Sequence, residues 1–291
     1  MRSIEKILVM LRADPAEDLA LRRGKQLAQT LGAELQLLLC DPHEGHTEYL
    51  EGLLAKLRRE GFRVQGEQVK GQPHHACSAI LAAHQRHACD LVIKQHHPDS
   101  TLSQLFTLPD DWQLSRELPT PLLLVKTPRC WEGGTVLATM DVDHLDQEHR
   151  ALQGNVMDYT AELCRLFQAE LHVVSAYSAP ALPLADPAIG IDQAIAQHCH
   201  DQCQWFQHEY ELAERHLHIG EGPAKTLIPR VANEQGAVLT VVGTIGRSGL
   251  GGILVGNTAE TVLDRLNSDV LILKPHELPV KRVEPSGHRA A

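Results

Sequence analysis

Short apolar runs alternate with longer amphipathic stretches along the chain, the pattern expected of β-strands and α-helices in turn. In the first half we predict strands at 7–11, 35–40, 62–69, 91–94 and 122–126 and helices at 15–31, 47–60 and 76–87. In the second half we predict strands at 136–140, 171–176, 217–220, 238–242 and 270–274 and helices at 147–167 and 191–216. Strands that alternate with helices build parallel sheets, so the pattern predicts an α/β fold.

The second half repeats the order of elements found in the first. The tripeptide Ala-Glu-Leu at 33–35 recurs at 169–171, and Lys126 and Lys274 each close the last strand of their half. We therefore predict two tandem Rossmann-like domains, at 1–130 and 135–276, each with a five-stranded parallel sheet. A linker that contains Pro and Gly joins them near 127–134, and a flexible tail follows at 277–291.

Each half ends on a strongly apolar strand, at 121–126 and at 269–274. An apolar strand left unpaired at a sheet edge is an aggregation hazard. The linker is long enough to let both strands meet within one chain. We therefore predict that they pair and that the halves pack as a pseudo-dimer. Self-association through another face, giving a homodimer, is a second expectation.

Charge and composition exclude several classes of protein. Asp and Glu outnumber Lys and Arg by 37 to 27, and only 4% of residues are aromatic, which argues against a nucleic-acid binder. No apolar run approaches the roughly 20 residues of a membrane span. The N-terminal stretch is typical of a strand and not of a signal peptide. The seven cysteines include no Cys-x-x-Cys pair, which favours reduced thiols and a cytoplasmic location.

Six glycines separate the strand at 238–242 from the next helix, at positions 243, 246, 249, 251, 252 and 256. Asn257 or Thr258 begins that helix, and Asn257 can form a capping box with Glu260. A glycine-rich loop between a parallel strand and a helix lets backbone N–H groups converge on an anion. The segment is neither a Walker A loop nor Gly-x-Gly-x-x-Gly. The alternative interpretation is a flexible surface loop.

The spacing Gly243-x2-Gly246-x9-Gly256 resembles the nucleotide motif of the universal stress protein family. Asn257 stands where the family has Ser or Thr, and Thr258 follows one position later. Within the family the chain is most similar to the tandem, E-type members. The resemblance implies an adenine nucleotide α-hydrolase-like fold. It also implies that ATP, with or without Mg²⁺, binds in the second half only.

The same resemblance implies a pose for the nucleotide. Asp141, after the first strand of the second half, would bond the nucleoside, and the backbone of Val173, at the end of the second strand, would meet the adenine. The nucleotide-binding residues that the resemblance implies are Asp141, Val173, Gly243, Gly246, Arg247, Gly256, Asn257 and Thr258. They gather at the carboxyl ends of strands, where open α/β sheets bind ligands. For Asp141 alone, the alternative is a cap after the strand.

The first half departs from this pattern. Arg12 occupies the position of the nucleoside-binding Asp, and we place Lys94 and His97 at the positions of the first two motif glycines. No glycine occurs between residues 71 and 133. Side chains throughout such a loop keep backbone N–H groups away from a phosphate, so we predict that this half binds no nucleotide. Lys94, His96 and His97 would form either a solvated loop or a site for another anion.

Evidence for metal binding or nucleophilic catalysis is weaker. Cys199 and Cys203 lie one helical turn apart with His200 between them, which could ligate zinc. The alternative is that both thiols pack in the core. The helical stripe that favours packing is Ile195, Cys199, Cys203, Phe206, Tyr210 and Ala213. No nucleophile elbow is present in the sequence.

These observations favour a non-catalytic, stress-related sensor or adaptor that binds ATP or a related adenine nucleotide and offers a surface to a protein partner. A weak ATP hydrolase is the first alternative, although Arg247 is the only cation near the expected γ-phosphate and no base is evident. The second alternative is a structural or carrier protein that binds another ligand between the domains.

Overall fold

The structure is a computed structural model that describes residues 4–12, 18–41, 46–70, 76–96, 110–141, 146–177, 204, 207–244 and 262–275. The elements of the first half are β1 (Lys6–Leu11), α1 (Leu19–Leu31), β2 (Glu34–Asp41), α2 (Thr47–Arg59), β3 (Val64–Lys70), α3 (Ala76–His87), β4 (Leu91–Gln95), α4 (Asp110–Glu117) and β5 (Leu122–Val125). Those of the second half are β6 (Thr135–Met140), α5 (Gln147–Phe167), β7 (Glu170–Tyr177), the 3-10 helix η3 (Glu214–His216), β8 (Leu217–Glu221), α7 (Ala224–Glu234), β9 (Leu239–Gly243) and β10 (Asp269–Leu273).

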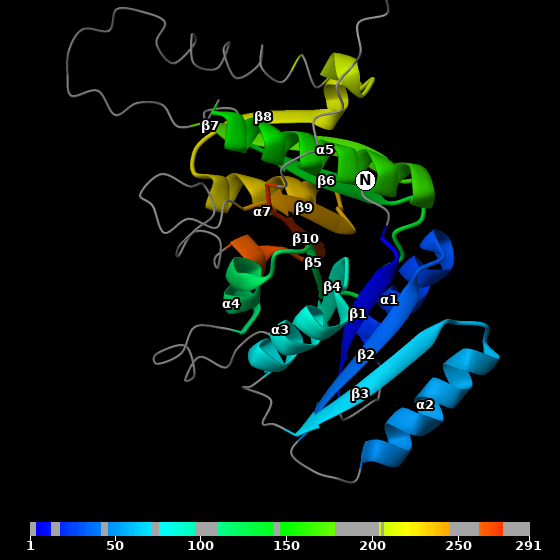
Figure 1. Cartoon of the computed structure of the whole chain (residues 1–291). Helices are drawn as coiled ribbons and strands as arrows, with labels where there is room; N and C mark the ends of the chain where they lie inside the picture. Colours follow the sequence, from blue (N-terminus) through cyan, green and yellow to red (C-terminus); the bar gives the residue numbers. More distant parts are fainter. Residues whose placement is uncertain are drawn as a thin grey trace, which may run out of the picture.

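These ten strands form one continuous sheet in the order β3-β2-β1-β4-β5-β10-β9-β6-β7-β8 (Figure 1). The five strands of each half are parallel to one another, which confirms the predicted fold class. The halves meet where β5 pairs antiparallel with β10, and Leu123 lies opposite Leu271. This pairing confirms that the two apolar last strands come together. The domain bounds and the homodimer stay predictions.

Helices cover both faces of the sheet and bury two apolar cores. One core lies under α1, α2 and α5, whose buried leucines face the sheet. The other lies under α3, α4, α7 and the helical turn at 262–265. In Figure 1, α5 runs along β6 and α2 along β3. The helices of the described ranges include no candidate membrane span.

Most predicted elements occur within two residues of the expected bounds, and the first helix ends as expected. Gly32 adopts a φ of 68° and its N–H bonds to the carbonyl of Ala28. This left-handed conformation costs glycine little, so the helix stops there. The helix begins at Leu19 and was expected to begin at residue 15. Residues 15–17 lie outside the described residues.

The predicted helix at 191–216 is wrong at its end. Glu211 has a positive φ of 51°, and only a 3-10 turn, η3, precedes β8. Ala213 therefore lies outside any α-helix, so the predicted stripe does not extend to it. The part of this helix that carries Cys199 and Cys203 lies outside the described residues. Two further helices, α4 and α7, had no sequence prediction.

A buried carboxylate joins the two halves beside the β5–β10 pairing. Asp269, which is 0% exposed, accepts hydrogen bonds from Arg23 Nε at 3.1 Å and Nη2 at 2.7 Å. It also accepts from the backbone N–H of Lys126 at 2.9 Å and Thr127 at 3.1 Å and from Trp131 Nε1 at 2.9 Å. The Arg23 guanidinium lies 4.2 Å from the centre of the Trp131 ring. The Asp269 side chain of the second half thus holds α1 of the first half and the linker between the halves in place.

Candidate functional site

The carboxyl ends of β6, β7 and β9 lie together at one edge of the second-half sheet. β6 is the central strand of the three, since it pairs with β7 on one side and with β9 on the other. Asp141 follows β6, and Gly243 is the last residue of β9. The topology therefore places these two expected site residues on neighbouring strands. The arrangement is the one in which open α/β sheets bind ligands.

Asp141 lies half-buried at this edge. Its backbone carbonyl accepts a hydrogen bond from the Gln153 side chain of α5. The bond fixes the backbone at the point where the chain leaves β6. The helix α5 is capped by another residue, Asp146, which accepts from the N–H groups of Glu148 and His149. The capping role that was the alternative for Asp141 is thus filled by Asp146 at this helix.

Val173 does not lie at the end of its strand, so the expected position is wrong, whereas its contact with adenine stays a prediction. β7 continues to Tyr177, and Val173 pairs with Ala138 in the interior of the sheet with no exposed surface. The β6–β7 ladder ends at the pair of Met140 and Ser175. One step further along both strands brings Asp141 beside Ala176. The backbone at this strand end is therefore that of Ala176.

Gly243 has a packing role in the described structure. A Cβ atom built on it would lie 2.8 Å from both Cγ and Cδ2 of Leu152, which is shorter than any normal contact. The glycine therefore lets α5 approach β9 closely. This reason for glycine is independent of any nucleotide. Gly246, Arg247, Gly256, Asn257 and Thr258 lie outside the described residues.

The first half has a side chain at the strand end that corresponds to Gly243. The strand registers put Gln95, and not Lys94, at the position of Gly243, so the expected correspondence was one residue off. The Gln95 side chain accepts a hydrogen bond from the N–H of Leu19 at 3.2 Å, at the start of α1. Arg12 does follow β1 as Asp141 follows β6, and its N–H donates to Asp18. A side chain of the protein thus occupies this strand end.

Lys94 and His96 form neither a solvated loop nor an anion site. Both pair with Asp111 of α4, the His96 Nδ1 at 2.6 Å, and all three side chains are mostly buried. Burial by itself raises the pKa of the Asp111 carboxyl, but the hydrogen bond from His96 and the charge of Lys94 lower it below its usual value. His97 lies outside the described residues. The cluster holds α4 against β4.

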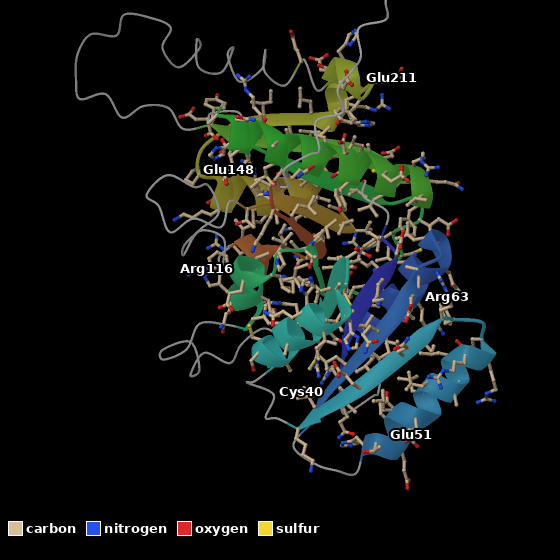
Figure 2. All side chains as sticks on the ribbon, in the orientation of Figure 1. Cys40, Glu51, Arg63, Arg116, Glu148 and Glu211 are labelled. Atoms are coloured by element: carbon tan, nitrogen blue, oxygen red, sulfur yellow. The ribbon has the colours of Figure 1, made fainter. Side chains whose placement is uncertain are left out.

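Each half donates a lysine to the last helix of the other. Lys126 Nζ donates to the carbonyl of Leu263, and Lys274 Nζ donates to the carbonyl of Arg116. Figure 2 labels Arg116 on α4, next to the orange segment of the second half. Burial lowers the pKa of both lysines. A lysine hydrogen bond therefore joins the two halves at each end of the β5–β10 pairing.

Helix α4 of the first half also lines a pocket at the end of β9. The pocket is partly open to solvent. Its lining residues are Trp112, Ser115, Val242, Gly243, Thr244, Val262, Leu263 and Ile272. Most of these side chains are apolar, and they come from both halves. The first half thus contributes to a cavity beside the expected nucleotide edge.

Two of the buried cysteines, Cys89 and Cys164, have no reactive character. Burial raises the pKa of the Cys89 thiol to about 11 and that of Cys164 to about 12. Both thiols therefore stay protonated at neutral pH and act as small apolar residues. Cys130 is exposed, and no disulfide joins it to another described cysteine.

A histidine cluster lies at the opposite, amino-terminal end of β7. The His172 ring stacks on the rings of His216 and His218, and Glu170 lies beside His172. Burial, followed by repulsion from His216 and His218, lowers the pKa of His172 to about 4. No sequence pattern predicted this cluster. The only sequence signal was the alternation His216-Leu-His218 at the start of a strand. The pairing of β8 with β7 brings these histidines beside His172, and the sequence alone does not show that pairing.

Comparisons with known proteins agree with the fold. A model of the universal stress protein family matches residues 142–274. The chain is 29% identical to universal stress protein E of Escherichia coli (strain K12), over 97% of this chain and 98% of that protein.

Solved structures extend the likeness over both halves. A protein of Pseudomonas aeruginosa UCBPP-PA14 described as a universal stress protein is 42% identical, covers 94% of each chain and superposes with a TM-score of 0.80. A universal stress protein of Archaeoglobus fulgidus is 13% identical over 94% of this chain, with a TM-score of 0.64, and shares the fold.

Proposed function

Because the chain belongs to the universal stress protein family and is similar over almost its whole length to E-type members, we propose that its second half binds ATP or a related adenine nucleotide. The single observation that carries the proposal is the juxtaposition of Asp141 and Gly243 on neighbouring strand ends, directly before the motif glycines. The protein would act in the stress response as a nucleotide-dependent sensor or adaptor for a protein partner.

The described part of the site fits a nucleoside. The Asp141 carboxylate can accept from ribose hydroxyls, and the Ala176 backbone, beyond the last β6–β7 pair, can bond a base edge. Phosphates would then lie over Gly246 and at the helix start near Gly256, where backbone N–H groups favour anions. Mg²⁺, when present, would accompany the phosphates and neutralise part of their charge.

The proposal predicts one nucleotide per chain. The first half has Arg12 in place of the carboxylate, and Gln95 fills its strand end by bonding Leu19. Titration calorimetry of the full chain with ATP is therefore expected to give a stoichiometry of one. Two equivalent sites would contradict the assignment of the first half.

Substitution of Gly246 by valine tests the loop. A β-branched side chain would stand where the phosphates approach, so we expect ATP affinity to fall about tenfold or more, which corresponds to at least about 1.4 kcal/mol. Circular dichroism should show the parent fold. Gly52→Val, on the exposed face of α2 with no atom within 4 Å of a built Cβ, is the matched control. Equal ATP affinity of Gly246→Val and the parent would show that the loop is not the site.

Gly243 is unsuitable for this test, because any side chain there meets Leu152 and would disturb packing and binding together.

Phosphate-release kinetics with saturating ATP distinguish a sensor from a hydrolase. A sensor should release phosphate no faster than the Gly246→Val variant does. Release that is faster in the parent would establish turnover at this site.

The pocket lined by α4 favours a second candidate function. Trp112 and Leu263 give the pocket an apolar wall from both halves, which suits an apolar group. A carrier of an apolar ligand would use it. Mass spectrometry of ligand released from the purified protein separates the two functions, since an adenine nucleotide supports the first and an apolar molecule the second.

A further inference from the structure

Three imidazoles and one carboxylate converge at the edge of the sheet where β7 begins. Glu170 and His172 come from β7, His216 from η3 and His218 from β8. One ligand atom each of Glu170, His172 and His216 lies within 4.8 Å of the other two. Nitrogen and carboxylate oxygen at such separations surround a volume that suits a single ion.

His172 is the most buried member of this group. Its residue exposure is 5%, and its Nε2 has no hydrogen-bond partner although it is buried. The Nε2 lies 3.7 Å from Glu170 Oε2, on the side of the ring that faces the cluster. A buried polar atom without a partner is costly. A ligand at this point would remove that cost.

The other nitrogen of His172 is already held. Its Nδ1 lies 3.0 Å from Nε2 of His218, and the His216 ring stacks on the His172 ring at 4.3 Å. With the proton on Nδ1 and His218 as the acceptor, Nε2 carries a lone pair directed at Glu170. Metal-binding histidines use their second nitrogen in this way, because the outer hydrogen bond fixes tautomer and ring orientation.

We propose that Glu170, His172 and His216 bind a divalent transition-metal ion of the zinc class, with His218 as a positioning residue. Imidazole and carboxylate are ligands that Zn²⁺ accepts in tetrahedral sites, whereas Mg²⁺ and Ca²⁺ prefer sites made of oxygen alone. Three protein ligands leave a fourth position for water.

This site is separate from the proposed nucleotide site. Glu170 starts β7, whereas Ala176 lies six residues further along the same strand, about 20 Å away at ~3.3 Å per residue. A metal bound by the histidines is therefore not the Mg²⁺ that would accompany nucleotide phosphates. The inference stands whether or not the chain binds ATP.

The test is a Zn²⁺ titration of the full chain, stripped with a chelator and measured in competition with a colorimetric zinc chelator. Compared with the parent, His216→Ala and Glu170→Gln should each weaken the tightest site about tenfold or more. His149→Ala and Glu162→Gln, which change a histidine and a glutamate of α5 in the same half, are the matched controls. Neither control should change the affinity. Parent-like affinity of both site variants would overturn the proposal.

The absorption spectrum of bound Co²⁺ adds a readout of ligand type. Co²⁺ in this site should give visible bands of a tetrahedral nitrogen and oxygen ligand set without a thiolate charge-transfer band, and His216→Ala should abolish them. A thiolate band that persists in that variant would place the metal on cysteines and overturn the proposal. His218→Ala should weaken binding less than His216→Ala, and His218→Gln, which keeps an acceptor for Nδ1–H, should restore it. Unchanged affinity of His218→Ala would remove His218 from the site.

Discussion

Replacement of Asp269 by alanine is expected to destabilise the chain by about 3–5 kcal/mol. The substitution leaves the Arg23 guanidinium buried without its carboxylate and removes the acceptor of the Lys126 and Thr127 N–H groups. Burial lowers the pKa of Arg23, which reflects the cost of holding its charge away from water. Equilibrium unfolding in urea, with the slope compared between variants, measures the loss.

Two variants sharpen this prediction. Glu162→Ala breaks the exposed pair with Arg165 and should leave the free energy of unfolding nearly unchanged, because exposed ion pairs contribute little. Arg23→Met in the Asp269→Ala background removes the unpaired charge, so the double variant should lose less than the sum of the single losses. Strict additivity would show that the buried charge is not the cause.

Replacement of Leu123 by aspartate should separate or unfold the halves. Leu123 is 1% exposed and lies opposite Leu271 in the only antiparallel pairing among the described strands. An unpaired carboxylate there, together with the lost leucine, should cost about 5 kcal/mol or more, comparable with the whole stability of a domain. Limited proteolysis should show new cleavage in the linker at 127–134.

The matched control for this charge is Ala55→Asp, at an exposed position of α2. It adds the same side chain without burying it, so its proteolysis pattern should equal that of the parent. A Leu123→Asp chain as protease-resistant as this control would show that the β5–β10 pairing does not hold the halves together.

Errors of the sequence interpretation fall at strand ends. The family resemblance placed Val173 at the end of the second strand, yet β7 continues to Tyr177. Lys94 was aligned with Gly243 although the registers align Gln95. Apolar periodicity reports which residues face a core but not which residue is the last to pair. Ala176, which lies beside Asp141 one step beyond the last β6–β7 pair, has no chemical signature of its own.

The sequence also did not predict which polar groups lie inside the protein or which partners they have. Asp111 belongs to a helix that was not predicted, because its eight residues are mostly polar and lie close to prolines. Its partners, Lys94 and His96, therefore gave the pattern of a solvated loop. A charge on a short segment is interpreted as exposed until its partner is known.

The sequence by itself determined the α/β class, the duplication, five parallel strands in each half and the pairing of the last strands. These features follow from local apolar periodicity and from the need to cover an apolar edge, and both can be recognised in short segments of the sequence. The tertiary structure alone decided how buried charges are matched and which polar groups meet. Arg23 and Asp269 are 246 residues apart, and His172 and His218 are 46 residues apart. Such pairs have no periodicity, because the energy that selects them arises only when folding removes water from both partners.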